Sequence, residues 1–256
     1  MSRPLLKHTT TTGFATLLSR ITGLLRDSFI AQAIGVGAIS DAFLVAFKIP
    51  NFLRRLFAEG AFSQSFVPVI SEYKTQRGQA DVRELVAGVS GTLGGVLLLV
   101  SLVGVVAAPL IIYLFAVQWG ITGGSQFDMA VQMLRWTFPY LFFISLVSLF
   151  SGVLNSYGSF FIPAFTQVIM NLVMIVAAVV FATRSSNPGL VLAIGVFVSG
   201  LLQLLFQLPA VARLGLLALP RWRPALEGVR RVAKLMVPGI VGSSMAQISL
   251  LLDTQI

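Results

Sequence analysis

Residues 19–74 read SRITGLLRDSFIAQAIGVGAISDAFLVAFKIPNFLRRLFAEGAFSQSFVPVISEYK. Most of this stretch is apolar enough to enter a lipid bilayer, yet residues 20–59 within it carry five cations and three anions. Charges at membrane depth are costly, and they usually face the interior of a helix bundle or a watery cavity. The stretch therefore predicts a membrane protein with a polar site between its helices. The charged residues at positions 20–59 are Arg20, Arg26, Asp27, Asp41, Lys48, Arg54, Arg55 and Glu59.

The composition of the whole chain also indicates a membrane protein. Hydrophobic residues make up 56% of the 256 residues and charged residues 11%, with a mean hydropathy of +0.90. A soluble domain usually carries about 25% charged residues. The sequence has no cysteine and one histidine, His8, which excludes disulfide frameworks and thiolate or histidine-cluster metal sites. We expect an all-α, polytopic membrane helix bundle without a bound cofactor and without a role in nucleic-acid binding.

Apolar runs predict about six complete transmembrane helices plus part of a seventh, since a spanning helix needs about 20 mostly apolar residues. Pro50 is expected to kink the second helix, and Pro68 lies near its end. Polar loops are expected at residues 72–84 and 118–127. The expected helices cover residues 12–34, 40–71, 85–117, 128–154, 160–182 and 190–211, and a seventh apolar run starts near residue 235.

These runs predict a three-part organisation. Residues 1–212 would form an N-terminal six-helix lobe, 213–234 a cytoplasmic amphipathic linker that touches anionic headgroups, and 235–256 the start of a second lobe. The last run stops at Ile256, so we expect a fragment of a longer protein; a stand-alone seven-helix protein is the alternative. Positive residues gather in alternate loops, which predicts a cytoplasmic N terminus. These residues are Arg3, Lys7, Lys74, Arg77, Arg83, Arg213, Arg221, Arg223, Arg230, Arg231 and Lys234.

The first expected helix has one polar face. On a helical wheel at about 100° per residue, five of its residues share an arc of about 120°. Gly23, in the middle of the arc, would let a neighbouring helix or a ligand approach the backbone. The alternative is a salt bridge of Arg26 or Arg20 with Asp27 that only fastens helices together. In order around the wheel, the residues are Arg26, Ser19, Gly23, Asp27 and Arg20.

The second expected helix also groups its charges. Asp41, Lys48, Arg55 and Glu59 fall within about 40° of one another on an ideal wheel, while Arg54 points elsewhere. Arg55 and Glu59 could instead form a local i,i+4 pair, and one of the adjacent arginines could reach toward the cytoplasmic surface. The surplus of cations over anions favours an anionic ligand, and arginine binds phosphate bidentately. No catalytic set is visible, so binding and translocation are favoured over chemistry.

Five sequence blocks resemble the MurJ (MviN) family, the lipid II flippases within the multidrug/oligosaccharidyl-lipid/polysaccharide exporter superfamily. The resemblance covers nearly the whole chain, and NFLRRLFAEGAFSQ is its most specific part. The blocks are SRITGLLRD (19–27), SDAFLVAFKIPNFLRRLFAEGAFSQSFVPVISEYK (40–74), FPYLFFISLVSLFSGVLNSYGSFFIPAF (138–165), QLPA (207–210) and VPGIVGSSMAQISLLLDT (237–254).

The resemblance implies a two-lobe transporter of the bacterial inner membrane that flips lipid II by alternating access. It implies a cationic central cavity that binds the diphosphate, with the C-terminal half of the same protein supplying the rest. Asp253 could ligate a coupling ion, Na⁺ or H⁺, or could form an inter-helix hydrogen bond; the membrane potential could also drive resetting. Implied cavity residues are Arg20, Arg26, Arg54, Asp27, Asp41, Lys48 and Glu59.

Four other functions are weighed against this one. A flippase for another polyprenyl-diphosphate-linked sugar would need the same cavity chemistry, so only a substrate test separates the two. A cation-coupled drug exporter of the same superfamily would need an acidic or apolar cavity, which the surplus of arginine disfavours. A scaffold has no reason to bury charges, and an enzyme acting on polyprenyl diphosphates would need acidic metal-binding clusters, which are not visible.

Overall fold

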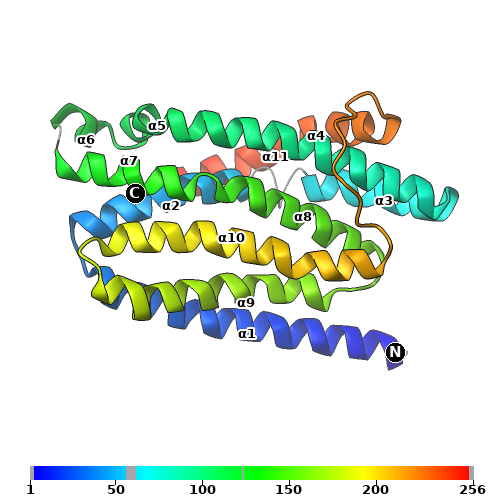
Figure 1. Cartoon of the computed structure of the whole chain (residues 1–256), viewed down its shortest axis with the longest axis horizontal. Helices are drawn as coiled ribbons and strands as arrows, with labels where there is room; N and C mark the ends of the chain where they lie inside the picture. Colours follow the sequence, from blue (N-terminus) through cyan, green and yellow to red (C-terminus); the bar gives the residue numbers. More distant parts are fainter. Residues whose placement is uncertain (1–2, 56–61, 123, 254–256) are drawn as a thin grey trace.

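Every regular element is a helix in the part of the chain that the computed structural model describes, residues 3–55, 62–122 and 124–253 (Figure 1). This confirms the all-α prediction. A π-helical turn at Ala177–Phe181 and a 3₁₀ turn at Ala182–Arg184 continue α9. The α-helices are α1 (Arg3–Ile34), α2 (Ala38–Arg54), α3 (Ser63–Gln76), α4 (Gln79–Val106), α5 (Ala108–Phe115), α6 (Val117–Thr122), α7 (Ser125–Thr137), α8 (Tyr140–Ser156), α9 (Phe161–Val176), α10 (Pro188–Arg213) and α11 (Glu227–Asp253).

Within the described residues, four helical stretches are long and apolar enough to cross a membrane. α1 carries Arg20, Arg26 and Asp27, and α2 and α3 are short, at 17 and 14 residues. The expected number of spans therefore stays a prediction, while the multi-pass character is clear. The four stretches are Gln79–Val106, Ser125–Ser156, Phe161–Arg184 and Pro188–Arg213.

The second expected helix is divided. α2 continues through the buried Pro50 and ends at Arg54, and α3 begins at Ser63 and continues through Pro68. Neither proline ends a helix. Glu59, which was expected on this helix, lies outside the described residues.

Both expected polar loops are largely helical. α3 and α4 extend over the first, so that only a short turn at Arg77–Gly78 remains, and α6 occupies part of the second. Polar residues readily form helix beyond the edge of a bilayer. A polar stretch in the sequence therefore indicates where the bilayer ends, but it does not indicate where the helix ends. The fourth expected helix is α7 plus α8, which Phe138 and Pro139 separate.

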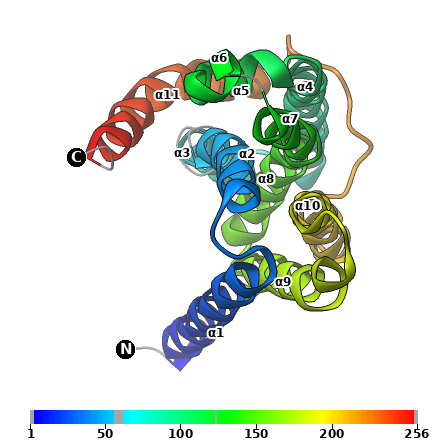
Figure 2. The ribbon, with the colours of Figure 1, turned by 90° about the vertical axis from the view of Figure 1, so that its left-hand side faces the viewer.

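Two buried clusters hold the helices together. One joins α2, α7, α8, α9 and α10 around Leu134, Tyr140 and Leu192, which are at most 1% exposed. The other joins α3, α4, α8 and the beginning of α11 around Phe66 and Leu85. Figure 2 shows the consequence: α1, packed on α9, and α11, packed on α3 and α4, project at opposite ends of a curved arrangement. α2 and α3 lie between them.

The expected amphipathic linker is only partly helical. Residues 214–226 contain turns but no helix, and α11 already begins at Glu227. The extended part lies along α4, where the backbone N–H of Arg221 donates to the carbonyl of Ala87 at 2.9 Å. The docking of this segment depends on α4, which offers Gly91 and Gly95 beneath it.

Ion pairs fasten this segment at the same end of the bundle. Arg231 pairs with Glu72 at 2.7 Å and Arg77 with Glu227 at 3.0 Å, and Arg223 pairs with Glu84. The hydrogen bond from Arg231 lowers the pKa of Glu72. The pairs are exposed, so each contributes little by itself, but together they align α11 with α3 and α4.

We expect Gly91→Ala to destabilise the fold by about 1–3 kcal/mol, the usual cost of overpacking. A Cβ at this position would overlap the backbone of Arg221, which cannot yield like a flexible side chain. The matched control is Gly94→Ala in the same helix, whose Cβ would lie 3.6 Å from Leu146 Cδ2, an ordinary contact. Thermal unfolding of the purified protein measures both. Equal unfolding temperatures would contradict the docking of the linker on α4.

Candidate functional site

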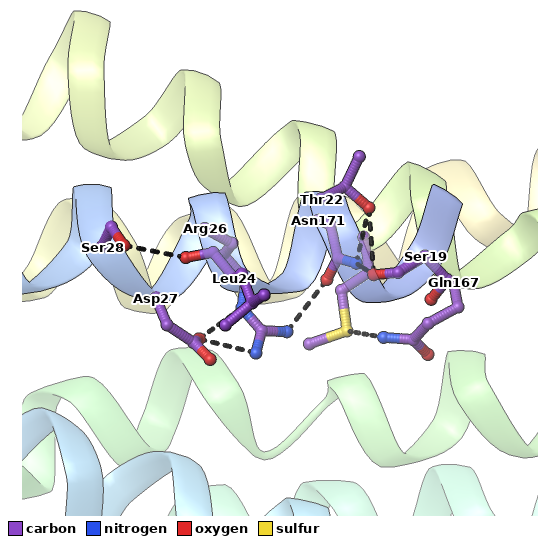
Figure 3. A network of polar contacts seen from close by, with 9 residues as sticks. Ser19, Thr22, Leu24, Arg26, Asp27, Ser28, Gln167 and Asn171 are labelled. Atoms are coloured by element: carbon purple, nitrogen blue, oxygen red, sulfur yellow. Dashed lines mark hydrogen bonds and ion pairs between the residues drawn. The ribbon is translucent and has the colours of Figure 1, made fainter. Parts of the chain in front are cut away.

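The guanidinium of Arg26 lies between α1 and α9 (Figure 3). Its Nη1 donates to Asn171 Oδ1 at 2.9 Å, and its Nε and Nη2 donate to Asp27 Oδ1 at 2.9 and 2.7 Å. The Arg26 side chain is 21% exposed and that of Asp27 is 65% exposed. The salt bridge weighed from the sequence is therefore present, and it leaves the carboxylate of Asp27 open to the surroundings.

Asn171 connects the same two helices by three hydrogen bonds. Besides accepting from Arg26, its Nδ2 donates to the carbonyl of Ser19 and to Thr22 Oγ1, both at 3.0 Å. The residue is 1% exposed. Hydrogen bonds between membrane helices typically contribute about 1–2 kcal/mol or less each, so three on one amide form a firm anchor.

The polar arc of α1 is split between two environments. Ser19 and Arg26 face α9, whereas Arg20 and Asp27, at the far edge of the arc, are exposed. Gly23 lies in the part that faces α9, but a Cβ there would lie 3.7 Å from Asn171 Nδ2, an ordinary contact. Close packing does not require glycine at this position.

Arg26, Asp27 and Asp41 line one pocket of about 410 Å³ between α1, α2 and α9. Gly35 and Gly37, with φ of 63° and 152°, form the turn that brings α2 back beside α1. The remaining lining is mainly apolar and includes Met170 and Met174 of α9. With one arginine and two carboxylates, this pocket has no surplus of positive charge.

Arg54 lines a different pocket, of about 290 Å³, between the α2–α3 region, α8, α9 and α10. Its Nε donates to Asn51 Oδ1 at 2.9 Å. No acidic residue lines this pocket in the part of the chain that the structure describes. Arg54 lines this pocket, whereas Asp41, Lys48 and Arg55 are exposed.

A polar layer connects α8, α9 and α10 beside the Arg54 pocket. Gln203 Nε2 donates to the carbonyl of Thr166 at 3.0 Å. Gln207 Nε2 donates to Ser151 Oγ at 2.8 Å and Thr166 Oγ1 at 3.0 Å. Both glutamines are fully buried, and among the described residues their Oε1 atoms have no hydrogen-bond partner. A buried acceptor without a partner costs about 1–3 kcal/mol, so this layer is incomplete by itself.

The structure thus brings some predicted site residues together and separates others. Arg26, Asp27 and Asp41 share a pocket, and Ser19 supports it through its carbonyl. Arg20, Lys48 and Arg55 line neither of the two pockets. The side chains of Glu59 and Asp253 lie outside the described residues. The part of the chain that the structure describes contains no group of three or more acidic or histidine side chains placed to hold a metal ion.

Asn171 and the glutamines of α10 were not predicted as site residues. A signal was present in the sequence: Asn171 interrupts the apolar run VIMNLVMIV, and Gln203 and Gln207 are four residues apart in LLQLLFQL. Polar residues within apolar helices usually face the bundle interior. Which helix receives them is decided by packing, because the period of one helix does not identify its neighbour.

We expect Asn171→Leu to destabilise the protein by about 1–3 kcal/mol, because buried polar partners on α1 lose their hydrogen bonds. Thermal unfolding in detergent measures the effect. Asn155→Leu, the same change at an exposed asparagine of α8, is the control. Unchanged stability of Asn171→Leu would show that the amide does not anchor α1.

Comparisons with known proteins place these features in a family. The model of a family described as "Lipid II flippase MurJ" matches residues 30–256. The chain is 47% identical over 247 residues to a probable lipid II flippase MurJ of Haemophilus influenzae, with 94% of this chain and 48% of the relative covered.

Solved structures give the same picture. A lipid II flippase MurJ in an inward closed conformation is similar with a TM-score of 0.75 and 26% identity, over 94% of this chain and 49% of that chain. A transporter of the MOP superfamily from Pyrococcus furiosus shares the fold, with a TM-score of 0.74 and 14% identity, over 96% of this chain and 54% of that chain. The chain spans about half the length of the relatives that it matches. Because the family model covers most of the sequence, this chain belongs to the lipid II flippase MurJ family.

Proposed function

We propose that this chain acts as one lobe of a transporter that flips lipid II from the cytoplasmic to the periplasmic leaflet of the bacterial inner membrane. Lipid II is a disaccharide pentapeptide linked to undecaprenyl diphosphate. The observation that carries the proposal is Arg26: a cation held at a pocket wall by Asn171 and Asp27, within a membrane helix bundle of this family. Family membership favours transport over enzymatic chemistry.

Arg26 suits a diphosphate that must be bound and then released. Guanidinium stays charged and donates in a planar fork that matches phosphate oxygens. The Nε and Nη2 edge of Arg26 is occupied by Asp27 Oδ1, so an incoming phosphate would exchange with this carboxylate. Asp27 is the more exposed partner and can turn away without losing solvation. The exchange keeps the guanidinium paired in both states and prevents excessively tight binding.

The remaining charged residues would act together with the other half of a full-length transporter. Arg20, Lys48 and Arg55 are exposed in this lobe, and Arg54 lies in its own pocket. Rocking of two lobes around these cations would give alternating access, as in other two-lobe transporters. The membrane potential or a coupling ion, with Asp253 as a candidate ligand, would drive the resetting step. Anionic headgroups would attract the basic linker.

The arrangement of basic segments supports a cytoplasmic N terminus. The beginning of α1, the α3–α4 turn, the α8–α9 connection and the segment before α11 lie at the same end of the bundle (Figure 1). Most of the arginines and lysines outside the helix cores belong to these segments. Positive residues favour the cytoplasmic face, so we assign this end to the cytoplasm.

We expect Arg26→Ala, in a chain of the relatives' full length, to lower lipid II exposure on the outer face about 10- to 100-fold. This corresponds to the loss of charge-assisted hydrogen bonds of about 1.5–3 kcal/mol. The host's own flippase is depleted, lipid II exposure is followed, and membrane levels of each variant are matched. Arg26→Lys should give a lipid II exposure between those of Arg26→Ala and the unmodified chain, because lysine keeps the charge but lacks the planar fork.

Arg184→Ala is the matched control, since Arg184 is exposed in the 3₁₀ turn after α9. It should preserve lipid II exposure. If Arg26→Ala flips as well as the unmodified chain, the arginine is structural and the mechanism is wrong. If the unmodified chain moves a different polyprenyl-linked sugar, the substrate is wrong and the anion-binding role of Arg26 stands.

A further inference from the structure

The pocket that Arg54 lines has an unusually polar wall for a membrane lobe. Of the twelve described residues that line it, eight carry a hydroxyl, amide or guanidinium group. The groove between α9 and α10 around Leu172 and Phe181 has an entirely apolar lining. Polar side chains inside membrane bundles are costly and are usually associated with a function. The polar members are Arg54, Ser63, Ser148, Ser151, Asn155, Thr166, Gln167 and Gln203.

The polar lining of this pocket indicates the kind of group that it would receive. Among the described residues, Arg54 is the one charged residue in the lining, and the other polar members are neutral hydroxyls and amides. These neutral hydroxyls and amides suit a ligand group that is itself rich in hydroxyls and amides.

Gln203 distinguishes such a group from a phosphate. Its Nε2 donates to the carbonyl of Thr166, and a flipped amide would place two acceptors against each other, so the orientation is fixed. Its Oε1 is buried without a partner among the described residues. Ionised phosphate oxygens only accept hydrogen bonds and cannot satisfy this atom. An O–H or N–H group can.

The size and the position of the pocket fit one sugar. Its volume of about 290 Å³ equals about ten waters at about 30 Å³ each and lies near the lower end of ligand pockets, about 300–1,000 Å³. Thr166 and Gln167 of α9 line this pocket, and Met170 lines the pocket of Arg26. Gln167 Nε2 lies 3.5 Å from Met170 Sδ. The two pockets are therefore neighbours along one face of α9.

We propose that the Arg54 pocket is a sugar subsite, which receives the hydroxyl- and amide-bearing sugar next to the diphosphate while Arg26 binds the diphosphate itself. The inference rests on the proposed function. It assigns recognition of the uncharged head group to Gln203, Ser148 and Asn155, on α10 and α8, and recognition of charge to α1. Specificity for the sugar and affinity for the anion are then carried by different residues.

The test compares two probes, lipid II and undecaprenyl diphosphate without the sugar, by their affinity for the full-length protein in lipid nanodiscs. Gln203→Leu should weaken lipid II binding about 5- to 10-fold and leave undecaprenyl diphosphate binding unchanged, since only the sugar reaches this wall. Ser148→Leu, which fills the pocket without removing the Gln203 amide, should give the same pattern. Arg26→Ala should weaken both probes.

Ser101→Ala is the control, because Ser101 Oγ is likewise buried without a partner among the described residues but lies on α4, outside the pocket lining. It should leave both affinities unchanged. If Gln203→Leu and Ser148→Leu preserve lipid II binding, or weaken both probes equally, the subsite is refuted while the proposed function stands. If the unmodified protein binds neither probe, the proposed function fails and the subsite fails with it.

Discussion

The buried amide of Asn171 holds α1, the helix with the most charges near its middle, against the apolar helix α9. It accepts from Arg26 and donates to Ser19 and Thr22. In a bilayer, an unpaired amide or guanidinium would be expensive, so each side of this contact depends on the other. The position of the Arg26 pocket and the splitting of the α1 polar arc follow from this contact.

α9 organises both polar regions of the lobe. One part of its face carries Asn171 and Met170, at the pocket of Arg26, and the next turn carries Gln167 and Thr166, at the pocket of Arg54. The first region is charged and partly open, whereas the described part of the second is neutral except for Arg54 and contains acceptors with no partner among the described residues. This division separates binding of an anion from recognition of an uncharged group, although both lie along one helix.

The sequence predicted the elements better than their ends. Apolar runs revealed the long helices of the lobe because burial in lipid demands them. One helix was expected over residues 40–71, but α2 ends at Arg54 and α3, which begins at Ser63, continues to Gln76. Polar residues were read as loops where α3, α4 and α6 continue. Hydrogen bonding within the backbone continues beyond the apolar core, so hydropathy locates the membrane edge and not the helix end.

The sequence by itself determined the helical membrane class, the family resemblance and the charged residues that a site would use. Composition and motif spacing are local properties, so they can be read from the sequence without knowing which residues are in contact. Tertiary structure alone decided that Arg26 and Arg54 line separate pockets and that Asn171 anchors Arg26. It also decided that Gln203 and Gln207 bury acceptors that have no partner among the described residues. Such pairings join residues far apart in the chain, and the helical period fixes the face of a residue but not the neighbour that this face meets.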